Sequence, residues 1–142
     1  MKARKISNRF PDSIVIGCDQ ILDFNSKILS KAKDQDELIH QLKQLQGNKH
    51  KLHSACVVYN AQKPEWRFIG SVSMTMRNLS DRYISKYVQD NWDDIKHSVG
   101  GYQIENSGIS LFSKIDGDYF SVLGLPIIQL IGHLLNRGVI EQ

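Results

Sequence analysis

An apolar run near the start of the chain predicts a buried β-strand. Residues 13–17 read Ser-Ile-Val-Ile-Gly, with Pro11 and Asp12 before them and a cysteine and an aspartate after them. β-Branched residues without polar alternation are typical of a short strand that is buried on both faces. Asp19 would then emerge at the strand end, where open α/β sheets bind ligands, although aspartate is also a common turn residue.

Periodicity predicts a mixture of strands and helices along the rest of the chain. Asp34 and Glu37 have the spacing of a helix capping box, and apolar residues follow at helical spacing until Gly47. Polar and apolar residues alternate from Lys51 to Tyr59, which indicates a strand with one buried face. The expected strands cover residues 20–24, 28–29, 51–59, 65–77 and 109–112, and the expected helices cover residues 34–47, 80–90 and 126–138.

Length and charge narrow the class of protein. The chain has 142 residues, of which 41% are hydrophobic and 23% charged, and this suits one compact domain over residues 1–142. A net charge of +3 with scattered basic residues argues against nucleic-acid binding and is compatible with an anionic small molecule. Both cysteines lie in apolar runs, as free thiols do in a reducing cytosol. Because no signal peptide opens the chain and no apolar run approaches bilayer length, we expect a cytoplasmic protein without membrane association.

Three histidine and cysteine residues, His50, His53 and Cys56, lie close together and suggest a metal site at first sight. The two-residue period of a strand, however, puts His53 on the opposite face from Cys56. A shared zinc ion would require a bulge, so the pattern favours a structural interpretation of these residues.

Four separated segments carry the chemistry that the sequence suggests. The first is Val-Ile-Gly-Cys-Asp-Gln at residues 15–20, with Lys31 a hairpin's length behind it. The others are residues 74–80, 100–105 and 117–126. In this order, the four segments resemble the Maf family of nucleoside triphosphate pyrophosphatases.

The four segments match the family motifs to different degrees. Residues 117–126 match the family's Gly-Asp-Tyr-x-x-Val-x-Gly-Leu-Pro signature, which is the most specific match in the chain. Gln20 replaces the threonine of the family's Val-Ile-Gly-Ala-Asp-Thr motif, and Lys31 stands in Ser-Lys-Ala instead of Gly-Lys-Pro. The resemblance implies an α/β fold with a mixed twisted sheet and flanking helices, of the Maf/inosine-triphosphatase type.

The resemblance also implies an activity and a set of site residues. The family hydrolyses a nucleoside triphosphate between the α and β phosphates, which yields a monophosphate and pyrophosphate. Asp19 would be the general base, or would hold the attacking water through a divalent metal ion, Mg²⁺ or Mn²⁺. Lys2 and Lys31 would offset charge on the phosphates, and Arg77 could bind phosphate, although each is also a common kind of surface residue.

Gln20 and Glu105 indicate one branch of the family. Glu105 falls where the family carries a glutamine at a substrate-specificity site, and together with Gln20 it resembles the branch that acts on 7-methyl-GTP. A methylated guanine is positively charged and keeps two ring-edge donors, so a carboxylate can both balance the charge and accept the hydrogen bonds.

One part of the family pattern has no counterpart in this sequence. The family's N-terminal strand and Ser-x-Ser-x-x-Arg phosphate loop would precede Lys2, so we expect an N-terminally truncated domain with an exposed sheet edge and apolar surface. The competing interpretation is an inactive Maf-like domain that binds a nucleotide or a partner chain. A homodimer is compatible with either interpretation.

Overall fold

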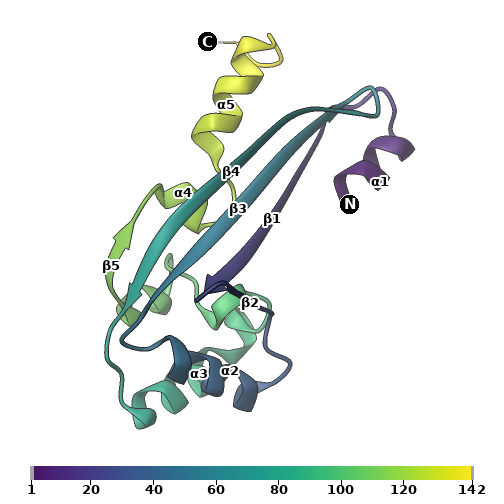
Figure 1. The fold of residues 1–142 in the computed structure, drawn as a ribbon. Helices are drawn as coiled ribbons and strands as arrows, with labels where there is room; N and C mark the ends of the chain where they lie inside the picture. Colours follow the sequence, from purple (N-terminus) through teal and green to yellow (C-terminus); the bar gives the residue numbers. More distant parts are fainter. Residues whose placement is uncertain (1, 142) are drawn as a thin grey trace. The chain divides into compact units, whose positions relative to one another are not determined.

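The chain contains one five-stranded sheet (Figure 1). In the computed structural model, which describes residues 2–141, the strand order is β2-β1-β3-β4-β5. The strands are β1 (Val15–Phe24), β2 (Lys27–Leu29), β3 (Lys49–Asn60), β4 (Lys63–Met76) and β5 (Phe112–Asp116). The helices are α1 (Lys2–Arg9), α2 (Gln35–Leu45), α3 (Asp81–Ile95), α4 (Tyr119–Val122) and α5 (Ile127–Asn136), with short 3₁₀ segments η1 (Val99–Gly101) and η2 (Ser107–Leu111). The predicted α/β class is confirmed.

The described residues form two compact units. The first unit comprises the described residues up to Gln20, residues 53–71 and the described residues from Asp118 onward. The second unit comprises residues 21–52 and 72–117. Strands β1, β3 and β4 therefore contribute residues to both units, whereas each helix belongs to one of them.

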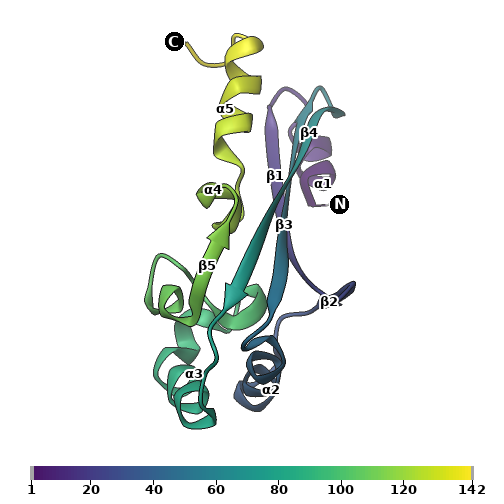
Figure 2. The ribbon, with the colours of Figure 1, turned by 60° about the vertical axis from the view of Figure 1, so that its left-hand side comes forward.

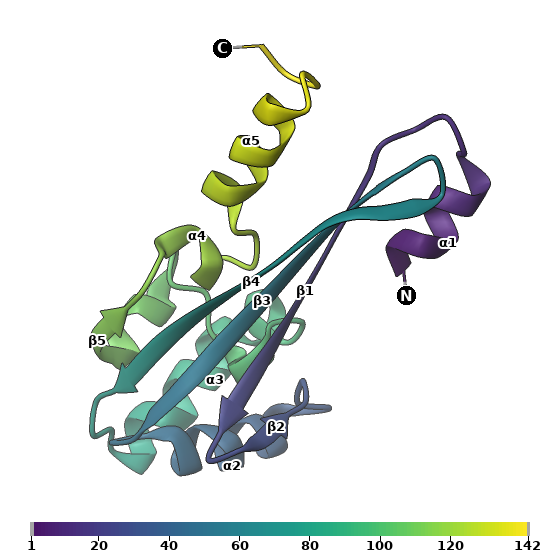
Figure 3. The same cartoon turned by 45° about the horizontal axis from the view of Figure 1, so that its top comes forward.

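Strand β1 differs from the prediction in length and in burial. It is one strand of ten residues, so Asp19 lies within it and not at its end. The side chains of Ile14 and Ile16 are 40% and 45% exposed, so the prediction of a short strand buried on both faces is wrong. Strand β2 pairs only with residues 22–24, and the preceding part of β1 lies beside β3 alone among the described strands (Figure 3). The apolar residues of β1 therefore border an exposed edge, as the sequence led us to expect.

The first unit is built on the hairpin of β3 and β4. Ala61 and Gln62 form its turn with φ values of 45° and 63°, the left-handed conformation that a tight two-residue hairpin turn requires. Burial of apolar side chains holds α5 against this hairpin. The cluster consists of Cys56, Val58 and Leu130, with Trp66, Leu125 and Leu134 packed against it. Glu65 also accepts hydrogen bonds from the Arg137 guanidinium, which keeps the pKa of the Glu65 carboxyl below its usual value.

The helices of the second unit follow the sequence closely at their starts. The Asp34 carboxylate accepts a hydrogen bond from the Glu37 amide at 2.8 Å, which confirms the cap of α2. The Ser80 hydroxyl caps α3 in the same way. Helices α2 and α3 pack against each other (Figure 2).

Two predicted boundaries in the second unit are wrong. Helix α3 continues through residues 91–94 to Ile95, because the buried Ile95 extends the apolar stripe past the polar residues. Residues 109–111 lie in the 3₁₀ segment η2, and the strand starts only at Phe112.

His50 lies in the core of the second unit. Its Nε2 atom and the Tyr102 hydroxyl are 2.7 Å apart, and the Tyr102 and Phe112 rings lie within about 6 Å of the imidazole centre. Burial lowers the pKa of His50 to about 4. The histidine is therefore neutral and structural at physiological pH, in agreement with the sequence-based interpretation.

None of the helices within residues 2–141 is long and apolar enough to span a bilayer.

We expect the protein to lose stability as the pH falls from about 6.5 to about 4. In this range the unfolded chain binds a proton on His50 and the folded chain does not. The free energy of unfolding therefore decreases as the pH decreases. The loss is about 1.4 kcal/mol per pH unit and roughly 3 kcal/mol in all, and it is absent above pH 6.5. Urea unfolding of the wild type and of His50→Gln across this range measures the effect. The variant should show the weaker pH dependence, and equal dependence in both proteins would contradict this account.

Candidate functional site

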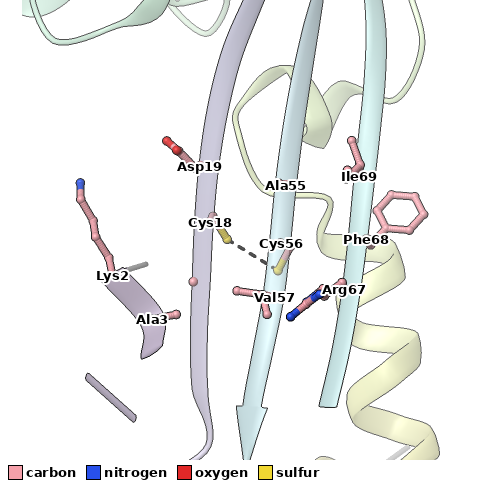
Figure 4. A pocket seen from close by; sticks show the side chains of 11 residues that line it. Lys2, Ala3, Cys18, Asp19, Ala55, Cys56, Val57, Arg67, Phe68 and Ile69 are labelled. Atoms are coloured by element: carbon pink, nitrogen blue, oxygen red, sulfur yellow. Dashed lines mark hydrogen bonds between the residues drawn. The ribbon is translucent and has the colours of Figure 1, made fainter. Parts of the chain in front are cut away.

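A pocket of about 410 Å³ lies in the first unit, lined by residues of α1, β1, β3 and β4 (Figure 4). Its volume falls in the range of small-molecule sites in proteins. The charged residues in its lining are Lys2, Asp19 and Arg67. The other lining residues are Ala3, Gly17, Cys18, Ala55, Cys56, Val57, Phe68 and Ile69. An apolar wall with a few charged groups suits an anionic ligand that also has an apolar portion.

Contact between Ala3 and Gly17 brings α1 onto β1. A Cβ atom at residue 17 would overlap the Ala3 methyl group and would lie 3.5 Å from Cγ1 of Val57. Only glycine therefore permits this approach, and Ala3 is buried as a result. The contact carries Lys2, the neighbour of Ala3, to the same pocket as Asp19.

The side chains of adjacent residues of β1 point to opposite faces of the strand. Asp19 and Cys18 extend in different directions, with the Cys18 sulfur turned toward Cys56 and the Asp19 carboxylate turned away from it (Figure 4). The carboxylate is exposed and accepts a hydrogen bond from the backbone N–H of Gln20 at 3.1 Å. A rigid strand thus holds an accessible carboxylate beside the pocket, which is a suitable geometry for a base or a metal ligand.

The Gln20 side chain ties β1 to β3 and α4. Its Nε2 atom lies 2.9 Å from the Ser54 hydroxyl, 3.1 Å from the Ser121 carbonyl and 2.9 Å from the Val122 carbonyl. The Ser54 hydroxyl also donates to the Ser121 carbonyl at 2.6 Å. The Gln20 amide group therefore has a structural role here, beyond the substrate contact that the sequence suggests.

The remaining predicted site residues belong to the second unit. Lys31 lies between β2 and α2, Arg77 directly follows β4, and Glu105 lies in a turn between η1 and η2. All three are exposed, and none of them lines the pocket of the first unit. The structure thus brings Lys2 and Asp19 together, while the assignment of Lys31, Arg77 and Glu105 to the same site stays a prediction.

Gly100 and Gly101 serve packing in the second unit. Their φ values are 73° and 65°, in the left-handed region, and both residues are buried. A Cβ atom would meet Leu22 at residue 100 and Leu38 at residue 101. These glycines therefore let the backbone lie close against apolar side chains of the second unit.

Sequence reasoning missed Arg67 as a pocket residue. The signal was present, because Trp66 and Phe68 alternate with Arg67 and Ile69 along β4, which places Arg67 on the other face from the aromatic rings. Nothing in the sequence, however, shows that this face of β4 borders the same space as Asp19. Only the packing of the strands and α1 reveals it.

Comparison with known proteins places the chain in a family. A family model described as Maf-like protein matches residues 1–137. The chain belongs to the Maf-like family. It is 50% identical over 141 residues to a protein named nucleoside triphosphate pyrophosphatase from Ruegeria sp. (strain TM1040), covering 99% of the chain and 71% of that relative. It is 42% identical over 139 residues to a protein named 7-methyl-GTP pyrophosphatase from Bartonella quintana (strain Toulouse), covering 98% of the chain and 70% of that relative.

The family match confirms the resemblance that the sequence motifs suggested. A third relative, named nucleoside triphosphate pyrophosphatase, from Ruegeria pomeroyi (strain ATCC 700808 / DSM 15171 / DSS-3), is 51% identical over 141 residues, 99% of this Maf-like chain and 71% of the relative. Both names thus occur among relatives that align with nearly the whole chain.

The described residues contain no cluster of three or more histidine, cysteine, aspartate or glutamate side chains that could hold a metal ion. Asp19 is the one carboxylate in the pocket lining. Magnesium often binds through one or two carboxylates and completes its shell with water and substrate phosphates. In the pocket of this Maf-like chain, Asp19 could be a carboxylate ligand of this kind.

We expect Gly17→Ala to displace α1 from β1 and to destabilise the protein by about 1–3 kcal/mol, as overpacking does. Thermal unfolding and amide hydrogen exchange of residues 2–9 measure the two effects. The matched control is Gly132→Ala in α5, where an added Cβ meets nothing within 4 Å. That control should be neutral or more stable by up to about 1 kcal/mol. Unchanged protection of α1 in Gly17→Ala would refute the close-contact account.

Proposed function

We propose that this chain hydrolyses a nucleoside triphosphate at the bond between the α and β phosphates and releases a nucleoside monophosphate and pyrophosphate. The observation that carries the proposal is the meeting of Lys2 and Asp19 at one pocket in a member of the Maf-like family. The names of the relatives support the broad activity. The choice of bond follows from the family resemblance and is part of the proposal.

In this proposal the groups in the pocket divide the work of hydrolysis. The exposed Asp19 carboxylate accepts a proton from the attacking water. Lys2 and Arg67 offset negative charge on the phosphates, and an arginine can do so with two parallel hydrogen bonds. Lys31 and Arg77 belong to the second unit, and their role as phosphate contacts stays an expectation from the family resemblance.

A divalent cation, Mg²⁺ or Mn²⁺, completes the proposed site. In the alternative role to that of general base, Asp19 would hold this ion and through it the attacking water, and the substrate phosphates would supply the other anionic ligands. When bound, the ion lowers the charge on the phosphates and the pKa of a coordinated water. Removing divalent ions with a chelator should therefore abolish turnover.

The proposed substrate is a nucleoside triphosphate with a modified base such as 7-methyl-GTP. Glu105 is exposed, so its carboxylate is free to meet the positively charged methylated base. The relatives named 7-methyl-GTP pyrophosphatase support this choice, although relatives with the more general name are also similar. The second candidate function is nucleotide binding without hydrolysis.

A pyrophosphate-release assay tests the function directly. The panel should contain the common nucleoside triphosphates and 7-methyl-GTP, each with Mg²⁺ and with Mn²⁺, and the Ruegeria sp. relative serves as the positive control. Calorimetric binding of a non-hydrolysable analogue, run in parallel, separates the two candidates. Binding without pyrophosphate release would favour the non-catalytic candidate, and the absence of both would exclude the two candidates together.

Asp19→Asn should lower kcat by about 10²–10⁴-fold with an unchanged fold, because the amide cannot accept the proton. Circular dichroism and the thermal midpoint check the fold. Asp12→Asn, at an exposed turn residue outside the pocket, is the matched control and should keep full activity. Retained activity in Asp19→Asn would exclude the role proposed for this carboxylate.

Glu105→Gln should reduce the ratio of kcat/KM for 7-methyl-GTP to that for GTP by about tenfold, the effect of about 1.4 kcal/mol from a lost charge interaction. The rate with GTP should change much less. Glu105→Asp keeps the charge and should retain part of the preference. If the glutamine variant has the wild-type ratio, Glu105 does not select the base.

A further inference from the structure

The first unit contains two thiols in contact. The sulfur atoms of Cys18 on β1 and Cys56 on β3 are 3.7 Å apart, and Figure 4 shows them turned toward each other. Both cysteines are free thiols. We propose that Cys18 and Cys56 are a redox-active pair that closes to a reversible disulfide across β1 and β3. The proposal goes beyond the proposed hydrolysis and does not depend on it.

The two cysteines lie directly opposite each other on neighbouring antiparallel strands. Gln20 comes two residues after Cys18 on β1, Ser54 comes two residues before Cys56 on β3, and a hydrogen bond of 2.9 Å joins them. The pairs 18 with 56 and 20 with 54 have the constant sum that antiparallel neighbours have. Cβ atoms of opposite residues are about 4.5–5.5 Å apart, whereas a disulfide needs about 3.5–4.5 Å. A movement on the order of 1 Å therefore allows the bond to form.

Strand pairing restrains β1 around Cys18 at one edge. Around Cys18 it lies beside β3 on one side, and β2 pairs only with residues 22–24 further along. Among the described residues, no second strand thus restrains this part of β1 at its other edge. A shift of this part of β1 toward β3 therefore breaks no pairing with another described strand.

The exposures of the two thiols define the order of reaction. Cys18 is exposed, whereas Cys56 is 2% exposed. Burial raises the pKa of the Cys56 thiol to about 12, so Cys18 is the sulfur that meets an external oxidant first. Cys56 then lies within reach of the modified Cys18 sulfur and completes the bond.

With glutathione disulfide as the oxidant, both steps are thiol–disulfide exchanges. The Cys18 thiolate attacks one glutathione sulfur, the glutathione disulfide bond breaks, and one glutathione leaves. The Cys56 sulfur then attacks the Cys18 sulfur, and the second glutathione leaves as the Cys18–Cys56 bond forms. In total the two protein thiols lose two electrons and two protons, which one glutathione disulfide takes up to give two glutathione molecules.

Titration of the full chain with glutathione disulfide and glutathione at rising ratios tests the proposal. We expect both thiols to disappear in one transition, with a mass loss of two hydrogen atoms and a cross-link between the tryptic peptides that carry Cys18 and Cys56. Dithiothreitol should restore both thiols. Each state can be read by maleimide labelling under denaturing conditions, so the assay needs no enzymatic activity.

Two variants make the test decisive. Cys56→Ala removes the second sulfur, so Cys18 should accumulate the mixed disulfide with glutathione. Cys18→Ala leaves only the buried thiol, which should stay reduced at ratios that oxidise the wild type. The proposal fails if wild-type Cys18 stops at the mixed disulfide while Cys56 stays free. It also fails if the wild type keeps both thiols at ratios that modify Cys56→Ala.

Oxidation should also affect the neighbouring Asp19, a consequence that rests on the proposed function. Closing the disulfide moves the backbone next to the carboxylate, and a displacement of about 1 Å can cost on the order of 10²-fold in rate. The oxidised wild type should therefore turn over at least tenfold more slowly than the same sample after dithiothreitol. Equal rates would refute the coupling to Asp19, while the thiol titration decides on the disulfide itself.

Discussion

The contact between Ala3 and Gly17 is the constraint on which the pocket depends. It lets a helix and a strand approach more closely than any side chain at residue 17 would permit, since a Cβ atom there would overlap the Ala3 methyl group. Lys2 reaches the pocket because it precedes Ala3, and Asp19 borders the pocket because it lies two residues after Gly17 on the same face of β1. The lack of a side chain at Gly17 thus brings the cation of Lys2 and the carboxylate of Asp19 to the same pocket.

Successive side chains of β1 point to opposite faces of the strand, and the residues of the two faces have different roles. The Asp19 carboxylate turns away from Cys56, while the side chains of Cys18 and Gln20 contact residues of β3 and α4. The long amide side chain of Gln20 spans from β1 to the carbonyl groups of Ser121 and Val122. The shorter threonine of the family motif could not make these contacts from the same position. Substitution at this position therefore changes the support of the strand as well as any contact to substrate.

The family match and the geometry support the proposed hydrolysis in different ways. The relatives associate this kind of chain with nucleoside triphosphate pyrophosphatases, and one group of names specifies 7-methyl-GTP. The geometry adds Arg67 as a second cation beside the pocket, a residue that none of the matched motifs contains. It also gives the paired glycines at residues 100 and 101 a packing role against Leu22 and Leu38, so their presence does not by itself indicate a ligand.

The sequence by itself determined the family, the α/β class and the local starts of the helices. The family motifs are short runs of consecutive residues, so the sequence alone reveals them. Caps such as Asp34 and Ser80 bind backbone amides only three residues further along the chain. Tertiary structure alone decided that β1 is one long, half-exposed strand and that Cys18 faces Cys56. It also decided that Arg67 and Lys2 border the pocket of Asp19. The burial of a strand and the set of residues that line a pocket depend on which distant segments pack together. Periodicity within one segment carries no information about its neighbours in space.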